Sequence, residues 1–337
     1  MSFNTNGKLR KVVAVGDIHG DYYRILRILE EQQILIPGTL VWDPFSDNVD
    51  LVFIGDYVDW RNELLEGDDK EWNKGPYKVL WLLRFLVETT EKLRKKNKSF
   101  KSKVYIIMGN HDDMMLESLN IVNKLDDEDI NNIINDPTGY LVVAEKYNEL
   151  GKPEIVEDIL RFLNWFVQGG EHTMNSFGGY SEWKKSLEGD MGEFLDKNLR
   201  LGVVINNKLY THSVPDKKEF WVKIENAGNI KCGVKNKLKD AFLWGRRIWG
   251  YDYQTGQRTK PHSSAEVDEM LRMCGVKGFV VGHTPMKKDY PVMAYEGRIV
   301  NIDLHGVPGS QPYVEIYYKD DSKDKKQDSS QNKKHHG

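Results

Sequence analysis

The feature that most constrains the fold of this chain is a set of three short apolar runs, each ending in glycine and an acidic or amide residue. The runs cover residues 11–18, 50–56 and 104–110. Short apolar runs bounded by turn residues are typical of buried strands. Apolar spacing predicts an amphipathic helix over 21–32, and start and stop signals predict another over 75–96. Strands that alternate with helices indicate an α/β fold.

The rest of the chain adds a helical middle and a second β-rich part. Two helices are predicted before residue 170, and the second should stop at Gly169-Gly170. A hairpin with its turn at Asn206-Asn207 is predicted next, followed by three strands. The predicted helices cover 125–136 and 153–168, the hairpin covers 201–213, and the later strands cover 278–284, 297–303 and 313–318.

Composition excludes several classes of function. The 337 residues carry a formal net charge of -3, which gives no electrostatic reason to expect nucleic acid or a membrane as the main partner. The two cysteines, Cys232 and Cys274, cannot build a disulfide framework. No apolar run reaches the ~20 residues that span a bilayer, and the first residues lack the apolar segment of a signal peptide. We therefore expect a soluble, cytoplasmic protein, and leave its oligomeric state open.

The three strand ends supply side chains that suit a metal site. Because the carboxyl ends of strands in an open α/β sheet form the ligand crevice, these ends should meet at one edge. Asp17 and His19 are two residues apart, which places them on the same side of an extended chain. Two further histidines follow apolar runs. The candidate ligands are Asp17, His19, Asp56, Asn110, His212 and His283.

Each of these signals has an ordinary explanation when it is taken alone. Gly-Asp after a strand is usually a turn, and a histidine after an apolar run is usually a core residue. The three motifs together, each at a strand end, favour a site. Carboxylate, imidazole and amide ligands without thiolate suit manganese, iron or zinc. Six ligands exceed the need of one ion, so we expect two divalent ions that share Asp56 as a bridge.

These motifs resemble those of a known family. Residues 16–20 (GDIHG), 55–59 (GDYVD) and 109–112 (GNHD) resemble the phosphoprotein phosphatases, in the bacterial and phage branch of the calcineurin-like metallophosphoesterase superfamily. The stretches 165–178, 243–247 and 280–285 extend the resemblance, which spans about 11–318. It implies a central β-sandwich flanked by helices. Residues 1–10 are then a polar leader, and the charged segment 319–337 is expected to be a disordered tail.

The resemblance also implies a role for each site residue. One metal would be held by Asp17, His19 and Asp56, and the second by Asp56, Asn110, His212 and His283. His111 would be the general acid, oriented by Asp59. Substrate phosphate would contact Asn110 and Arg246, or its neighbour Arg247.

The chain departs from the family pattern after the second motif. Trp60 stands where the family has a phosphate-binding arginine, so Arg61 becomes the candidate for that contact. Trp60 itself suits either a stacking platform or a packed aromatic at the rim of the site. The polar stretch 62–75 is longer than expected, and Asp112 replaces the usual glutamate. These departures bear on substrate preference more than on metal binding.

The implied activity is hydrolysis of phosphoserine and phosphothreonine by direct attack of a metal-bridging water, with manganese as the expected metal. The partner would be a phosphorylated protein. Small phosphoesters are the alternative substrates, including nucleotides, dinucleoside polyphosphates and RNA-end phosphates, because a fold does not fix its substrate. A third hypothesis is a catalytically inactive phosphate-binding scaffold.

Overall fold

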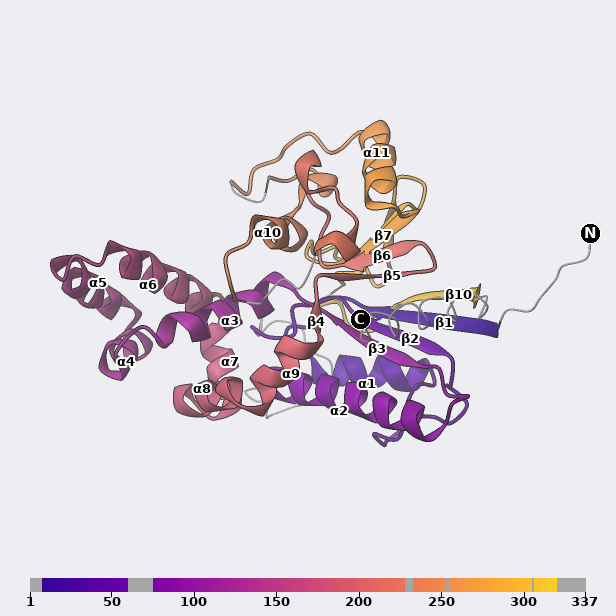
Figure 1. Ribbon diagram of the computed structural model, residues 1–337, viewed down its shortest axis with the longest axis horizontal. Helices are drawn as coiled ribbons and strands as arrows, with labels where there is room; N and C mark the ends of the chain where they lie inside the picture. The colour runs from indigo at the N-terminus through magenta and orange to yellow at the C-terminus, as the bar shows by residue number, and fades with distance from the viewer. Residues whose placement is uncertain (1–7, 60–74, 228–232, 253–254, 305, 320–337) are drawn as a thin grey trace, which may run out of the picture.

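The computed structural model describes residues 8–59, 75–227, 233–252, 255–304 and 306–319 of the chain. Two five-stranded sheets pack face to face, and helices cover the outside (Figure 1). The predicted α/β fold, a β-sandwich flanked by helices, is confirmed.

The first sheet carries the three sequence motifs at its strand ends. Its strand order is β10-β1-β2-β3-β4, in which β1 to β4 are parallel and β10 is antiparallel to β1. Strand β2, which leads to Asp56, therefore lies between β1 and β3. The bounds are Lys8–Val15 for β1, Val49–Phe53 for β2, Lys103–Ile107 for β3, Leu199–Arg200 for β4 and Tyr313–Lys319 for β10.

The second sheet supplies the two later histidines. Its order is β5-β6-β7-β9-β8, with β6, β7 and β9 parallel to one another. The β5–β6 hairpin turns at Asn206 and Asn207, which both have positive φ, as the hairpin prediction requires. The strands are β5 Gly202–Ile205, β6 Lys208–Thr211, β7 Gly278–Val281, β8 Val292–Ala294 and β9 Ile299–Asn301.

Helices surround the sheets, and α4 to α6 form a lobe that projects away from them (Figure 1). The α-helices are α1 Tyr22–Glu31, α2 Gly75–Lys96, α3 Asn110–Val122, α4 Asp127–Asn135, α5 Tyr140–Glu149, α6 Pro153–Trp165, α7 Glu171–Phe177, α8 Tyr180–Glu188, α9 Asp190–Asn198, α10 Lys237–Trp244 and α11 Ser264–Cys274. A π-helical turn, Phe166–Gly170, joins α6 to α7. Short 3-10 helices cover Pro137–Gly139, Lys218–Phe220, Ile224–Ala227 and Arg247–Trp249.

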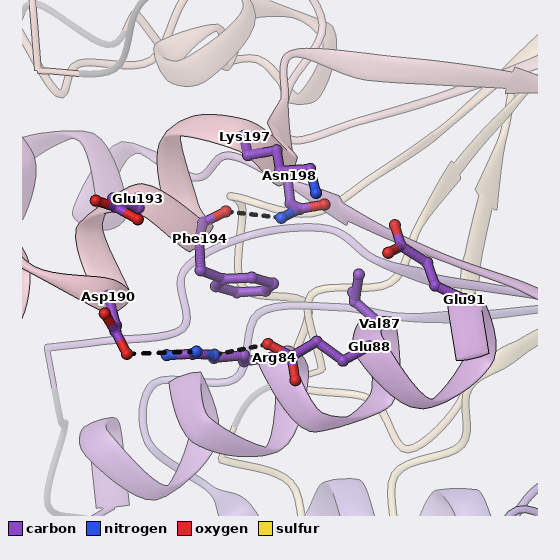
Figure 2. Close-up of a pocket in the computed structure, with 9 residues that line it drawn as sticks. All are labelled: Arg84, Val87, Glu88, Glu91, Asp190, Glu193, Phe194, Lys197 and Asn198. Carbon is purple, nitrogen blue, oxygen red and sulfur yellow. Dashed lines mark hydrogen bonds and ion pairs between the residues drawn. The ribbon is translucent and has the colours of Figure 1, made fainter.

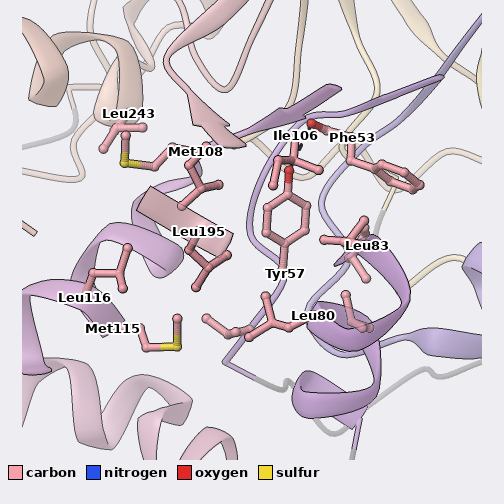
Figure 3. Packing of buried hydrophobic residues seen from close by; sticks show 14 of the residues in the cluster. Phe53, Tyr57, Leu80, Leu83, Ile106, Met108, Met115, Leu116, Leu195 and Leu243 are labelled. Carbon is pink, nitrogen blue, oxygen red and sulfur yellow. Dashed lines mark hydrogen bonds between the residues drawn. The ribbon is translucent and has the colours of Figure 1, made fainter. Parts of the chain in front are cut away.

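Alternation along β1 explains the two layers of the core. Val12 and Ala14 belong to the cluster between the two sheets, whereas Val13 and Val15 belong to the cluster under the helices. Strands buried on both faces read as continuous apolar runs, which is why the sequence reveals them. Figure 3 shows the helix-side cluster, where Tyr57 lies between strand and helix side chains.

The predicted elements end earlier than expected wherever they approach the site. β1, β2 and β3 stop three residues before the predicted ends, because the last residues form the loops that carry site side chains. Helix α6 ends at Trp165, and Gly169 breaks the helical path with a φ of 122° before α7 begins. Strand β1 begins at Lys8, inside the segment expected to be a polar leader. Residues 320–337 of the expected tail lie outside the described residues.

Across the part of the chain that the structure describes, no helix combines the length and apolarity needed to cross a bilayer.

Candidate metal centre

The six candidate ligands lie together at the carboxyl ends of the strands of both sheets. Asp17 and His19 follow β1, and Asp56 follows β2. Asn110 opens α3 directly after β3, which is possible because Gly109 lies against Asp56 with no room for a side chain. The other two ligands, His212 and His283, follow β6 and β7. All six side chains are buried.

Asp56 lies at the centre of this cluster. Its Oδ2 is 3.6 Å from Nε2 of His19, and its Oδ1 is 3.5 Å from Nε2 of His212. Two groups with metal-ligand spacing share Asp56: one includes His19 and His111, and the other includes His212 and His283. A carboxylate with a histidine nitrogen beside each oxygen is placed to bridge two cations.

Backbone carbonyls orient the two histidine rings that face Asp56. His19 Nδ1 lies 3.0 Å from the carbonyl oxygen of Val58, and His212 Nδ1 lies 2.8 Å from that of Ile54. A carbonyl only accepts, so each Nδ1 donates and each Nε2 keeps its lone pair. This arrangement presents Nε2 as a ligand.

The Asp17 side chain lies against the backbone of His283. Its carboxylate accepts from the backbone N–H of His283, at 3.1 and 3.0 Å for the two oxygens. Gly282 permits this approach, since a Cβ there would lie 2.0 Å from Asp17 Oδ1. Burial raises the pKa of Asp17 well above its usual range, and the nearby charges of Asp303 and Asp56 raise it further. A cation beside these carboxylates would reverse that shift.

The donor set fits divalent cations. Burial lowers the pKa of both His212 and His283, which favours the neutral imidazole that binds metals. Oδ1 of Asn110 lies 2.9 Å from Nε2 of His212, so two lone pairs face each other. A cation between them would remove this repulsion. The assignment of individual residues to each of two metal ions stays a prediction. The group with ligand spacing around His19 and Asp56 contains His111 and not Asp17.

His111 and Asp59 form a pair beside the cluster. His111 Nδ1 lies 2.8 Å from Asp59 Oδ2, and both residues are buried. The backbone N–H of His111 donates to Asp56 Oδ1 across 3.0 Å. The side chain of Asn110 turns instead toward His212, so neighbouring residues present their side chains to different partners.

Asp112, which the sequence reading noted only as a departure, holds two of the loops together. Its Oδ2 accepts from the backbone N–H groups of Asp56 and Gly109, and its Oδ1 accepts from that of Tyr57, all at 2.8 Å. An aspartate in the first turn of α3 thus fixes the loop that carries Asp56. The capping pattern of Asp112, three residues after Gly109, is the signal that could have revealed this role.

Backbone strain collects at the same place. His19, Asp56, Asp59 and His283 all have positive φ, between 46° and 66°, although none is glycine. Non-glycine residues in this region cluster at functional sites, where the surrounding structure holds them. The sequence alone does not predict these conformations.

Two described arginines contact the cluster: Arg24 donates to the backbone carbonyl of Asp17, and Arg246 contacts His283. The Nε of Arg246 donates to His283 Nε2 across 3.0 Å, and its Nη2 donates to the His283 carbonyl across 3.2 Å. Arg247 instead contacts the carbonyl of Lys260 and the carboxylate of Glu266. The structure therefore places Arg246 at the site and Arg247 away from it. Trp60 and Arg61, with the stretch 62–74, lie outside the described residues.

A separate hollow of about 240 Å³ lies between α2 and α9 (Figure 2). Arg84 crosses it, 2.8 Å from Glu88 and 3.7 Å from Asp190. Four carboxylates and two basic groups line it, so its charge disfavours a phosphate ligand. The lining residues are Arg84, Val87, Glu88, Glu91, Asp190, Glu193, Phe194, Lys197 and Asn198.

The fold and site together define a class of hydrolases that act on phosphoesters with divalent metals. The sequence model of the calcineurin-like phosphoesterases matches residues 10–287. The chain therefore belongs to the calcineurin-like phosphoesterase family. Membership implies divalent metal ions, and the histidine and aspartate clusters described above agree with that.

Solved structures support the fold. A cold-active protein tyrosine phosphatase is similar with a TM-score of 0.54 and 18% identity, over 92% of this chain and 74% of that one. Another structure of a cold-active protein-tyrosine phosphatase, from a psychrophilic Shewanella species, has a TM-score of 0.50 and 17% identity, over 94% of this chain and 80% of that one. At this identity the likeness concerns the fold alone. A comparison of the sequence with curated proteins gave no match.

Proposed function

We propose that the protein is a phosphomonoesterase that hydrolyses phosphoserine and phosphothreonine with two divalent metal ions. The observation that carries the proposal is the buried His111–Asp59 pair, which lies directly beside the ligand cluster around Asp56. This arrangement combines a group that can donate a proton with a centre that can bind a phosphate.

His111 would serve as the proton donor. Its Nδ1 donates to Asp59 Oδ2, which leaves Nε2 to carry a proton to the leaving oxygen. When bound, the cations lower the pKa of the attacking water and neutralise charge on the phosphate oxygens. Asp59 would hold the ring in the required tautomer and stabilise its protonated form.

Arg246 would hold the substrate phosphate. A guanidinium at the edge of the cluster can turn from the His283 ring to two oxygens of a phosphate and bind both at once. Asn110, next to His212, would add a neutral contact.

The presence of an acid favours alkyl phosphates as substrates. A serine or threonine alkoxide is a poor leaving group and needs protonation, whereas a phenolate leaves more easily. A buried histidine–aspartate pair is therefore more useful for phosphoserine and phosphothreonine than for an aryl phosphate. We further propose manganese as the metal, because the candidate ligands are oxygen and imidazole, and the cytoplasm as the location.

A substrate panel tests the proposal. Turnover of phosphoserine and phosphothreonine peptides by the manganese-loaded protein should exceed that of nucleotides, dinucleoside polyphosphates and RNA-end phosphates. A higher kcat/KM for any of these small phosphoesters would assign the site to that class instead. No turnover of any substrate, including an aryl phosphate, would favour a phosphate-binding scaffold.

A further inference from the structure

Trp165 and Thr173 contact the same oxygen of Asp59. Trp165 Nε1 donates to Asp59 Oδ1 across 3.0 Å, and Thr173 Oγ1 donates to it across 2.8 Å. The other oxygen, Oδ2, is the one that faces His111. Trp165, Thr173 and Asp59 are fully buried. One carboxylate oxygen is thus held by the surrounding helices, and the other is left for the histidine.

The hydroxyl of Thr173 also holds the backbone of Asp59. It accepts from the Asp59 N–H across 2.9 Å while it donates to the carboxylate of the same residue. Asp59 has a φ of 60°, a conformation that a non-glycine residue keeps only when its neighbours enforce it. A single hydroxyl therefore fixes both the main chain and the side chain of Asp59.

The segment between Trp165 and Thr173 is shaped for these contacts. It contains the turn Phe166–Gly170, in which Gly169, with a φ of 122°, breaks the helical path between α6 and α7. A Cβ on Gly169 would lie 3.0 Å from the backbone of Asp59, and one on Gly170 would lie 2.6 Å from the Trp165 indole. Two glycines thus let the turn close onto Asp59 and Trp165 at once.

We propose that Trp165 and Thr173 are positioning residues for acid catalysis, and this rests on the proposed function of His111. A carboxylate can rotate about its last bond, and two donors on Oδ1 fix its plane so that Oδ2 faces the His111 ring. The same donors compensate a buried anion for the water that it has lost. Without them, Asp59 would no longer hold the His111 ring in the orientation and tautomer that protonate a leaving oxygen.

The experiment compares variants that remove one donor each. Thr173→Val removes the hydroxyl, and Thr173→Ser keeps it. Trp165→Phe removes the indole N–H, and Trp183→Phe is its matched control. Trp183 is equally buried and stacks on Trp165 at 5.4 Å, and its Nε1 has no hydrogen-bond partner among the described residues. Each variant is assayed with a phosphoserine peptide and with an aryl phosphate, and its metal content is measured.

Thr173→Val and Trp165→Phe should lose roughly 10- to 100-fold in kcat on the phosphoserine peptide, a part of the usual benefit of acid catalysis. The loss on the aryl phosphate should be much smaller, and both metals should remain, since His19 keeps the carbonyl of Val58 as its acceptor. Thr173→Ser should recover the peptide activity, and Trp183→Phe should show no difference between the substrates. Equal losses on both substrates, or no recovery with serine, would overturn the proposal.

A double variant separates this proposal from the proposed function. If Thr173 acts through His111, then Thr173→Val should cost little further peptide activity in a His111→Asn background. An undiminished loss there would show that Thr173 acts by another route. If His111→Asn alone lost equal activity on the two substrates, the assignment of His111 as the acid would be wrong. That outcome can be measured without any variant of Trp165 or Thr173.

Discussion

At the scale of single residues, the site depends on contacts among a few buried polar groups. Asp56 faces His19 with one oxygen and His212 with the other, and it also accepts from the backbone of His111. The sequence predicted that these candidate ligands lie close together, and their roles as metal ligands stay a prediction. The positive φ values of Asp56 and Asp59 could not be predicted, because they depend on contacts from distant segments.

Asp56→Asn should damage metal binding more than Asn110→Ala or His283→Ala, because only Asp56 belongs to both groups of ligands. Outer contacts of metal sites are worth about 10- to 100-fold in affinity, so loss of a shared ligand should exceed that range. Metal content of the three purified variants decides the matter. Retention of two ions at wild-type affinity by Asp56→Asn would show that the carboxylate is not a bridge.

His111→Asn should lose about 10²–10⁴-fold on a phosphoserine peptide and clearly less on an aryl phosphate, while it keeps both metals. The reason is that an alkoxide needs protonation more than a phenolate does. Steady-state kinetics with both substrates and metal analysis provide the measurement. Since His111 also lies within ligand distance of His19 and Asp56, loss of metal would identify it as a ligand instead.

At the scale of elements, the predicted strands include β1 and β2, whose residues are mostly buried, and also β10, in which Ile316 and Tyr318 are exposed. The helices from α7 to α11 escaped prediction, although Ser263 and Glu266 form a capping box that marks the start of α11. Strand β8 has three residues, too few to show a period of two. In these segments tertiary packing decides the structure more than the local pattern does.

Gly169→Ala tests whether the turn between α6 and α7 supports the site. Gly169 has a φ of 122°, so any side chain is strained there at a cost of about 1–3 kcal/mol, and it would also press on Asp59. We expect a lower melting temperature and lower turnover of the phosphoserine peptide. The control is Gly151→Ala, where φ is 70° and a Cβ would meet nothing within 4 Å. Equal turnover in the two variants would show that the turn at Gly169 does not support catalysis.

His262 makes folding stability depend on pH. The ring is buried, and burial lowers its pKa from 6.5 although the Glu266 carboxylate, 3.7 Å from Nδ1, acts to raise it. The neutral His262 ring costs the protein no stability above the pKa of about 6.5 that His262 has in the unfolded chain. As the pH falls from there toward the lower pKa of the folded protein, the free energy of unfolding decreases. His262→Phe should weaken the acid-side decline in unfolding free energy. An identical pH profile for both proteins would show that protonation of His262 does not contribute.

At the scale of the whole molecule, the two sheets bring together candidate ligands that are far apart in the sequence. Asp17 lies 266 residues from His283, yet their atoms meet at 3.0 Å because β1 and β7 end at the same edge of the sandwich. The order of the motifs predicted that edge correctly. The support from the α6–α7 segment could not be predicted in its details, since it depends on how a helical turn packs onto Asp59.

The most direct test of the account measures metal stoichiometry and turnover on the same sample. The protein is stripped with a chelator and titrated with manganese, while bound metal and phosphoserine-peptide hydrolysis are followed together. Stripping should abolish turnover, and turnover should return as two ions bind to each chain. Full turnover in the metal-free protein, or saturation at one ion per chain, would contradict this expectation.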